Sequence, residues 1–365
     1  MGLGGGGYDL DRFNAAMVKL NAQGATGMDG ISLGVSKKNF TSAVDLLLSV
    51  WRTPALPENE FNTAKASLLA SMDAVTSNPA TVAAKEVAFR FDNYPEGHPG
   101  KTKTFAKSRE DIEELTYEDV TSCWKETAGL SHYTIAVVGN MTKEEVESLW
   151  ETRIKMLPQS KIPYERIPAI KPPEAVDASP ILVQMPNKPN AYIQGMGLLP
   201  ITDSNPDFAS LRLAFNILGD GAESRIWKKL REKDGLAYSA SSALAPNTLD
   251  PRTIFAFSAT AASNNWQQAL DALKKEVVGA LDNGFTETEV ESARKKFLAD
   301  RQPFLVNESG YIGTLDAGLY INRDQFQFFS MYDASMERMT ARDVTEAFKK
   351  YVQFNKIVWS VGGGN

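Results

Sequence analysis

The sequence predicts an α+β protein made of two homologous units, each a mostly antiparallel sheet covered by helices on one face. The chain has 365 residues, which is too long for one ordinary hydrophobic core and fits two domains. Its hydrophobic content of 43% and charged content of 23% are typical of a soluble globular protein. One pattern of helices and strands also occurs twice, in the same order, which indicates duplication.

The first unit is expected over residues 1–157. Apolar residues three and four positions apart predict helices over 9–22, 40–51, 58–75 and 79–91. Alternating residues predict a strand over 31–36, and a short apolar run predicts another over 133–139. Thr116 is expected to cap a further helix, and Thr142 to open one through a capping box.

Two stretches rich in proline or glycine interrupt this pattern. Residues 92–108 are expected to form turns. Residues 158–180 carry six prolines and predict a semi-extended linker, so the second unit is expected over 181–365.

The second unit begins with two strands, 181–185 and 191–199, expected as a hairpin-like pair. A helix ending at Gly219 and another over 225–233 follow. The remaining expected elements are strands over 237–245, 253–260 and 357–362, and helices beginning after Asn264 or Asn265, Thr286 and Thr340.

The two units match segment by segment. Residues 40–51, 58–65 and 115–120 recur in order at 266–277, 287–294 and 339–344. About 38 residues precede Leu218-Gly219 in the second unit, but only two precede the matching Leu3-Gly4. The first unit is therefore expected to lack its opening hairpin and first helix, which would expose a sheet edge. On this basis the chain is expected to be a fragment, to be nicked, or to borrow strands from elsewhere.

Composition excludes several classes of function. A net charge of −6 without a basic cluster argues against nucleic-acid binding. No apolar run approaches the roughly 18 residues that a membrane span needs. The single cysteine, Cys123, excludes an internal disulfide and a cysteine-built zinc site, and is expected to be a small buried residue. The compartment cannot be read from the sequence.

The segment 230–239 (Leu-Arg-Glu-Lys-Asp-Gly-Leu-Ala-Tyr-Ser) predicts a helix end, a glycine stop and a strand start. Gly235 suits the left-handed position after a helix. Arg231 and Tyr238, seven residues apart, could point into one cleft and hold a carbonyl or a developing oxyanion. The alternative interpretation is a solvated helix end followed by a core tyrosine.

With its duplicated units and its Arg231-x-x-x-Gly235-x-x-Tyr238 motif, the chain resembles the insulinase, pitrilysin and mitochondrial processing peptidase family of zinc peptidases. The resemblance runs from about Gly4 to the end and implies a processing-peptidase-like metallohydrolase fold. In that family one half binds zinc through H-x-x-E-H, and the other half carries the Arg/Tyr pair. The resemblance therefore implies that Arg231 and Tyr238 grip a peptide, or its tetrahedral intermediate, held by a catalytic partner half.

This chain departs from the family in lacking metal ligands. Its two histidines, His98 and His132, have no H-x-x-E-H spacing and are expected to be surface residues. The helix expected over 207–218 holds neither histidine nor glutamate. No metal or other cofactor is therefore expected in this chain, and zinc is expected on the partner half.

Three functional hypotheses follow. The first is a non-catalytic half of a zinc metallopeptidase, inactive alone, that closes over a peptide bound at a catalytic half on the same polypeptide or a separate subunit. The second is a structural homologue, like the core subunits of respiratory complexes, with no role in proteolysis. The third, a self-sufficient enzyme, lacks any Ser/His/Asp set that could be argued from two surface histidines, although a carboxylate pair among 45 acids stays open.

Overall fold

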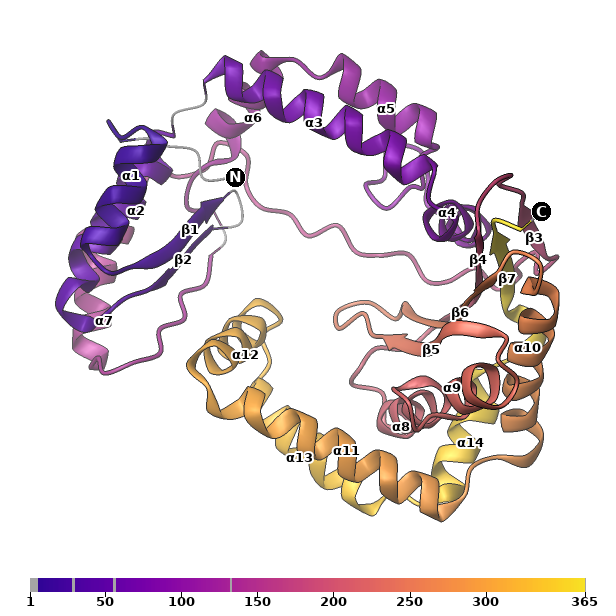
Figure 1. Cartoon of the computed structure of the whole chain (residues 1–365). Helices are drawn as coiled ribbons and strands as arrows, with labels where there is room; N and C mark the ends of the chain where they lie inside the picture. The colour runs from indigo at the N-terminus through magenta and orange to yellow at the C-terminus, as the bar shows by residue number, and fades with distance from the viewer. Residues whose placement is uncertain (1–5, 28–29, 55–56, 132, 365) are drawn as a thin grey trace. The chain divides into compact units, whose positions relative to one another are not determined.

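The computed structural model describes residues 6–27, 30–54, 57–131 and 133–364 (Figure 1). Its contacts group the chain into two compact units. Unit 1 comprises the described residues up to Ser71 together with Ala106–Arg166 and Asn307–Asp316. Unit 2 comprises Met72–Phe105, Ile167–Val306 and the described residues from Ala317 onward. Each compact unit thus contains segments from both halves of the sequence.

Unit 1 is mainly helical, with one two-stranded antiparallel sheet. Its elements are α1 (Leu10–Lys19), β1 (Gln23–Gly27), β2 (Gly30–Gly34), α2 (Phe40–Arg52), α3 (Glu58–Thr76, ending in unit 2), α5 (Phe105–Glu114), α6 (Tyr117–Thr127) and α7 (Lys143–Leu149). The predicted caps at Thr116 and Thr142 are confirmed. Each threonine hydroxyl accepts the backbone N–H of the acidic residue three positions later, and the backbone N–H of the threonine donates to the carboxylate of that residue.

Unit 1 differs from the predicted elements in three places. Residues 133–139 form no strand, and in the described part of the chain no strand pairs with them. Strand β1 was not expected, because its sequence of small and polar residues carries no strand pattern. Helix α5 was not expected either, since it follows a proline- and glycine-rich stretch and buries no residue. The predicted Leu3-Gly4 match lies outside the described residues.

Unit 2 is built on a five-stranded sheet in the order β3-β7-β4-β6-β5. The strands are β3 (Ile181–Val183), β4 (Asn190–Leu199), β5 (Ala237–Ala245), β6 (Thr253–Ala262) and β7 (Val358–Gly362). All pairs are antiparallel except β3 with β7. The predicted hairpin of the first two strands is wrong, because the fully buried β7 lies between them. An apolar strand buries more apolar surface, and pairs more of its backbone groups, inside the sheet than at its edge.

The predicted α+β class is confirmed, and the helices of the main core lie on one face of this sheet, either against the strands or against α8. They are α8 (Phe208–Gly219), α9 (Arg225–Trp227), α10 (Trp266–Asn283), α11 (Glu287–Val306), α13 (Gln325–Arg338) and α14 (Ala341–Tyr351), while α12 (Glu308–Tyr320) spans both units. Helix α8 is the most deeply placed, with ten buried residues. Its last residue, Gly219, lies so close to β5 that an added Cβ would stand 1.9 Å from the Ser242 nitrogen.

One helix of unit 2 lies on the other face of the sheet. Helix α4 (Pro79–Phe91) contacts β7, β4 and β3, and its Val87 and Phe91 pack against Val358. Arg252, the residue before β6, donates to the main-chain carbonyls of Phe91 and Ile170. The second half of the proline-rich stretch is therefore fixed to unit 2, although it has no regular secondary structure.

Candidate functional site

The Arg231–Tyr238 segment forms a corner between a helix end and the edge strand β5. Helix α9 continues as a single π-helical stretch, Lys228–Lys233, which carries Arg231. Gly235 has φ +62°, a conformation that costs glycine little, and the Leu236 N–H then donates to the Leu230 carbonyl at 2.8 Å. Such π turns recur at functional sites because they shift the side chains that follow them.

A β-bulge sets the direction of Tyr238. Ala237 faces Ala261 in the ladder, but Ser239 faces Thr260, so Tyr238 is an extra residue on β5. An extra residue breaks the alternation of a strand and places two neighbours on the same side. Tyr238 and Ser239 are accordingly both exposed, with Tyr238 at 57%, between the buried Ala237 and Ala240. The alternative interpretation of Tyr238 as a core residue is therefore wrong.

Arg231 is fixed against the same corner by two contacts. Its Nη1 donates to the main-chain carbonyl of Tyr238 at 2.6 Å. Its guanidinium carbon lies 4.5 Å from the centre of the Trp227 ring, a cation–π distance. The hydrogen bond holds Arg231 against the backbone of Tyr238 and leaves the Tyr238 phenol exposed.

A row of polar side chains crosses the sheet face on which α4 lies. Gln194 pairs in register with Ser360 on one side and with Ser258 on the other, and Ser258 pairs with Ser241. The hydroxyls of Ser241 and Ser258 lie 2.9 Å apart. Gln194 Oε1 and Ser360 Oγ are buried and have no hydrogen-bond partner among the residues that the structure describes. Sequence reasoning missed this row, although polar residues at alternate positions of two strands would have indicated it.

The residues that could bind a metal do not come together. Among the described residues, no three His, Cys, Asp or Glu side chains lie close enough to hold an ion. His98 lies in a turn, where its Nδ1 accepts the Gly100 N–H at 2.9 Å and its ring stacks on Tyr94. His132 lies outside the described residues. The His, Cys, Asp and Glu side chains that the structure describes therefore form no site for a catalytic zinc ion.

Two further features bear on the predicted exclusions. Cys123 is exposed rather than buried, because α6 carries it on a face that packs against no core cluster. In the described residues, no helix combines the length and the apolar character that crossing a bilayer requires.

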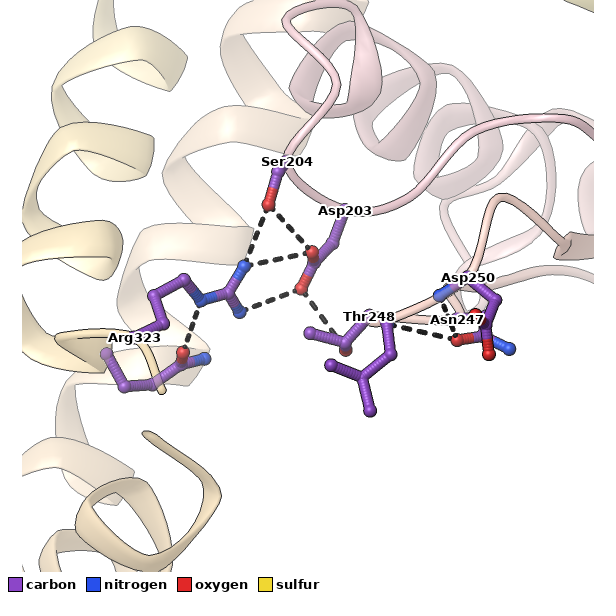
Figure 2. Close-up of polar contacts among 8 residues, drawn as sticks. Asp203, Ser204, Asn247, Thr248, Asp250 and Arg323 are labelled. Atoms are coloured by element: carbon purple, nitrogen blue, oxygen red, sulfur yellow. Dashed lines mark hydrogen bonds and ion pairs between the residues drawn. The ribbon is translucent and has the colours of Figure 1, made fainter. Parts of the chain in front are cut away.

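A second polar cluster ties three loops of unit 2 together (Figure 2). Arg323 forms a two-pronged ion pair with Asp203, with both nitrogen–oxygen distances at 3.0 Å. Thr248 and Ser204 also bond to Asp203. The pair is 19% and 11% exposed, and Arg323 stacks over Phe328, so the cluster is a structural clamp.

The protein has an α+β fold, with the exposed Tyr238 on a β-bulge and Arg231 bonded to the main-chain carbonyl of that residue. The family model of the peptidase M16 inactive domain matches residues 114–297, half of the chain. The chain belongs to this family of inactive M16 peptidase domains. The family resemblance predicted from the repeat and the Arg231–Tyr238 motif is thereby confirmed.

Individual relatives agree in fold. The "non-peptidase homolog YmxG" of Helicobacter pylori is 22% identical over 356 residues, covering 94% of this chain and 77% of that protein. A crystal structure of a peptidase M16 inactive domain from Pseudomonas fluorescens superposes with a TM-score of 0.82 at 20% identity, covering 99% of this chain and 85% of that one. The periplasmic protease PqqL from Escherichia coli gives 0.76 at 15% identity, covering all of this chain and 39% of that one.

Proposed function

We propose that this chain is the non-catalytic half of a zinc metallopeptidase. In this proposal it closes over a peptide bound at a catalytic half, carried on the same polypeptide or on a separate subunit. Zinc on that other half would polarise the scissile carbonyl, and this chain would bind no metal. Family membership, together with the absence of a metal-binding group among the described residues, supports this division of roles.

The observation that carries the proposal is the exposed corner of Arg231 and Tyr238. The bulge exposes the Tyr238 phenol on the edge strand β5, and the Arg231 guanidinium, from the preceding helical turn, bonds to the main-chain carbonyl of the same residue. Both are donors suited to a peptide carbonyl, and the guanidinium keeps its charge at any physiological pH. Held against Trp227, the guanidinium has lost part of its rotamer freedom before a peptide arrives, which lowers the entropy cost of binding.

A scaffold role is the second candidate. It is favoured by the similarity along nearly the whole chain to a protein described as a non-peptidase homologue. In that case Arg231 would serve only to close the corner, through its bond to the Tyr238 carbonyl. The scaffold role predicts a stable partner complex whose peptidase activity is indifferent to the Tyr238 hydroxyl.

The deciding experiment compares Tyr238→Phe with Tyr320→Phe in the complex with the catalytic half. Both tyrosines belong to unit 2 and are similarly exposed, at 57% and 53%. Losing one donor to a developing oxyanion costs about 100- to 1,000-fold in rate, so Tyr238→Phe should slow peptide cleavage at least about tenfold. Tyr320→Phe should leave cleavage unchanged. Equal rates for both variants, with folding intact, would favour the scaffold role.

The isolated chain supplies a companion measurement. Bound metal is measured in the same sample that is tested on a quenched-peptide library, with and without a zinc chelator. We expect neither stoichiometric metal nor chelator-sensitive cleavage. Stoichiometric zinc with chelator-sensitive turnover would refute the division of roles.

A further inference from the structure

Tyr332 of α13 lies among aromatic and arginine side chains of unit 2. Its ring centre is 6.4 Å from that of Phe208 on α8 and 5.9 Å from that of Phe328 on α13. The guanidinium carbon of Arg301, on α11, lies 5.9 Å from the Tyr332 ring centre and 3.9 Å from that of Phe329. Side chains from three helices of one unit, α8, α11 and α13, therefore surround this phenol.

Two buried hydrogen-bond donors of this cluster have no acceptor among the described residues. Arg301 donates from Nη1 to an Asp333 carboxylate oxygen at 2.5 Å, but its buried Nη2 has no hydrogen-bond partner in the described part of the chain. The Tyr332 hydroxyl is also buried and lacks a partner among the same residues. The Arg212 guanidinium acts on this hydroxyl, but a guanidinium carries only donors and cannot accept the phenol proton. Both groups therefore need an acceptor, because a buried donor without one destabilises the fold.

Positive charge exceeds negative charge in the same cluster. Asp203 is bound by Arg323 in the two-pronged ion pair (Figure 2), and Asp333 is bound by Arg301. Arg212, of α8, lies over an aromatic ring of its own helix and forms no ion pair with a described residue. Three guanidiniums thus accompany two carboxylates, which leaves one positive charge in a partly buried region without a counterion.

The remaining ionisable groups of the cluster do not supply that negative charge. Burial raises the pKa of Tyr332 to about 12, although the charges of Arg212 and Arg301 act in the opposite direction, so the phenol stays neutral. Glu337, which acts on Asp333, is exposed to solvent and is screened by it. The cluster therefore has two donors without an acceptor and one cation without an anion.

We propose that Arg212, Arg301 and Tyr332 bind a small monovalent anion with the size and charge of chloride. One such ion accepts from Arg301 Nη2 and from the Tyr332 hydroxyl, and its charge balances that of Arg212. Both donor atoms are buried, so the site takes an ion from solvent and not a peptide chain. It lies among helices α8, α11 and α13 rather than at the β5 corner, so it does not depend on the proposed role in peptide cleavage.

The test is thermal unfolding of the whole chain while chloride replaces gluconate at constant ionic strength. A ligand that binds only the folded state raises the melting temperature with the logarithm of its concentration above Kd. At a chloride concentration tenfold above Kd we expect a rise of roughly 3–6 °C. Tyr332→Phe removes the hydroxyl donor and Arg212→Met removes the excess charge, so each variant should lose most of this rise.

Tyr351→Phe and Arg342→Met are the matched controls. Tyr351 is also a partly buried tyrosine of unit 2, but its hydroxyl donates to an Asp207 carboxylate oxygen at 3.1 Å. Arg342 is an exposed arginine that pairs with Glu346. Both controls should keep the full chloride-dependent rise, whatever their melting temperature in gluconate.

Anomalous diffraction from crystals of the unchanged chain grown in bromide locates the ion without any variant. We expect a bromide peak in contact with Arg301 Nη2 and the Tyr332 hydroxyl. An ordered water at that place in bromide would overturn the proposal, as would a chloride effect that is absent or is equal in Tyr332→Phe, Arg212→Met and the unchanged chain. A stronger effect of acetate than of chloride would also overturn it, because the ligand would then be a carboxylate.

Discussion

Replacing Gly219 by alanine tests whether the end of α8 lies so close to the backbone of β5 that no Cβ atom fits between them. The new Cβ would lie 1.9 Å from the Ser242 nitrogen and 2.5 Å from the Ser241 carbonyl carbon, both backbone atoms. Contacts of Cβ below 3.0 Å are essentially never seen. The helix end and the strand would therefore have to move apart by roughly 1 Å, in a region where close packing leaves little room.

The expected loss of stability depends on how deeply α8 and β5 are buried where they would move apart. Ten residues of α8 are buried, and the Ser242 hydroxyl donates to the Phe215 carbonyl of the same helix at 2.5 Å. Overpacking of such a core costs about 1–3 kcal/mol. For a unit of this size, 1 kcal/mol lowers the melting temperature by about 2–4 °C. Gly219→Ala should thus melt several degrees below the unchanged protein.

Gly279→Ala is the matched control. Gly279 lies inside α10, its φ is not left-handed, and an added Cβ would meet no atom within 4 Å. Alanine there should stabilise the helix by about 0.5–1 kcal/mol, because glycine loses more backbone freedom on folding. Thermal and urea unfolding followed by circular dichroism should move in opposite directions for the two variants. Equal stability of Gly219→Ala and the unchanged protein would refute the argument.

Other predictions test single interactions. Burial raises the pKa of Glu289, but the hydrogen bonds from Arg225 at 2.6 and 2.7 Å, two hydrogen bonds from Thr286 and the charge of Arg225 together outweigh burial and hold that pKa below its usual value of 4.5. The ionised Glu289 therefore stabilises the folded state fully above pH 4.5, and this contribution is lost as the pH falls through the lowered pKa. In Glu289→Gln the urea concentration at the unfolding midpoint should consequently depend less on pH in the acidic range. Arg323→Ala leaves the largely buried Asp203 carboxylate without its cation and should lower the free energy of urea unfolding by about 3 kcal/mol. Adding Asp203→Asn to the same chain removes the buried charge and should restore part of that loss. Exposed Cys123 should react stoichiometrically with a thiol reagent in the native state, and reaction only after denaturation would contradict its placement.

The sequence carried enough information for the elements with a strong local signal. The threonine-capped helices α6 and α14 lie close to their predicted bounds, and so do α4 and α8. These signals depend on neighbours within one turn, so no distant residue had to be known. The left-handed backbone at Gly235 follows from the same kind of local reasoning.

Pairing between distant segments could not be read in the same way. Residues 133–138 have the composition of a buried strand, but a strand needs a partner, and in the described part of unit 1 none lies beside them. The position of β7 between β3 and β4 is likewise a property of the whole sheet. At the corner, the sequence indicated Arg231 and Tyr238, but the bulge that turns Tyr238 outward appears only in the register with β6.

Because α4 of the first repeat packs on β7 of the second, and residues 307–316 of the second repeat belong to unit 1, neither repeat holds all the parts of a compact unit. Cutting the gene at the proline-rich stretch would therefore yield two incomplete products rather than two independent domains. A protein built from one repeat alone would need this helix from a second copy, an exchange known as domain swapping.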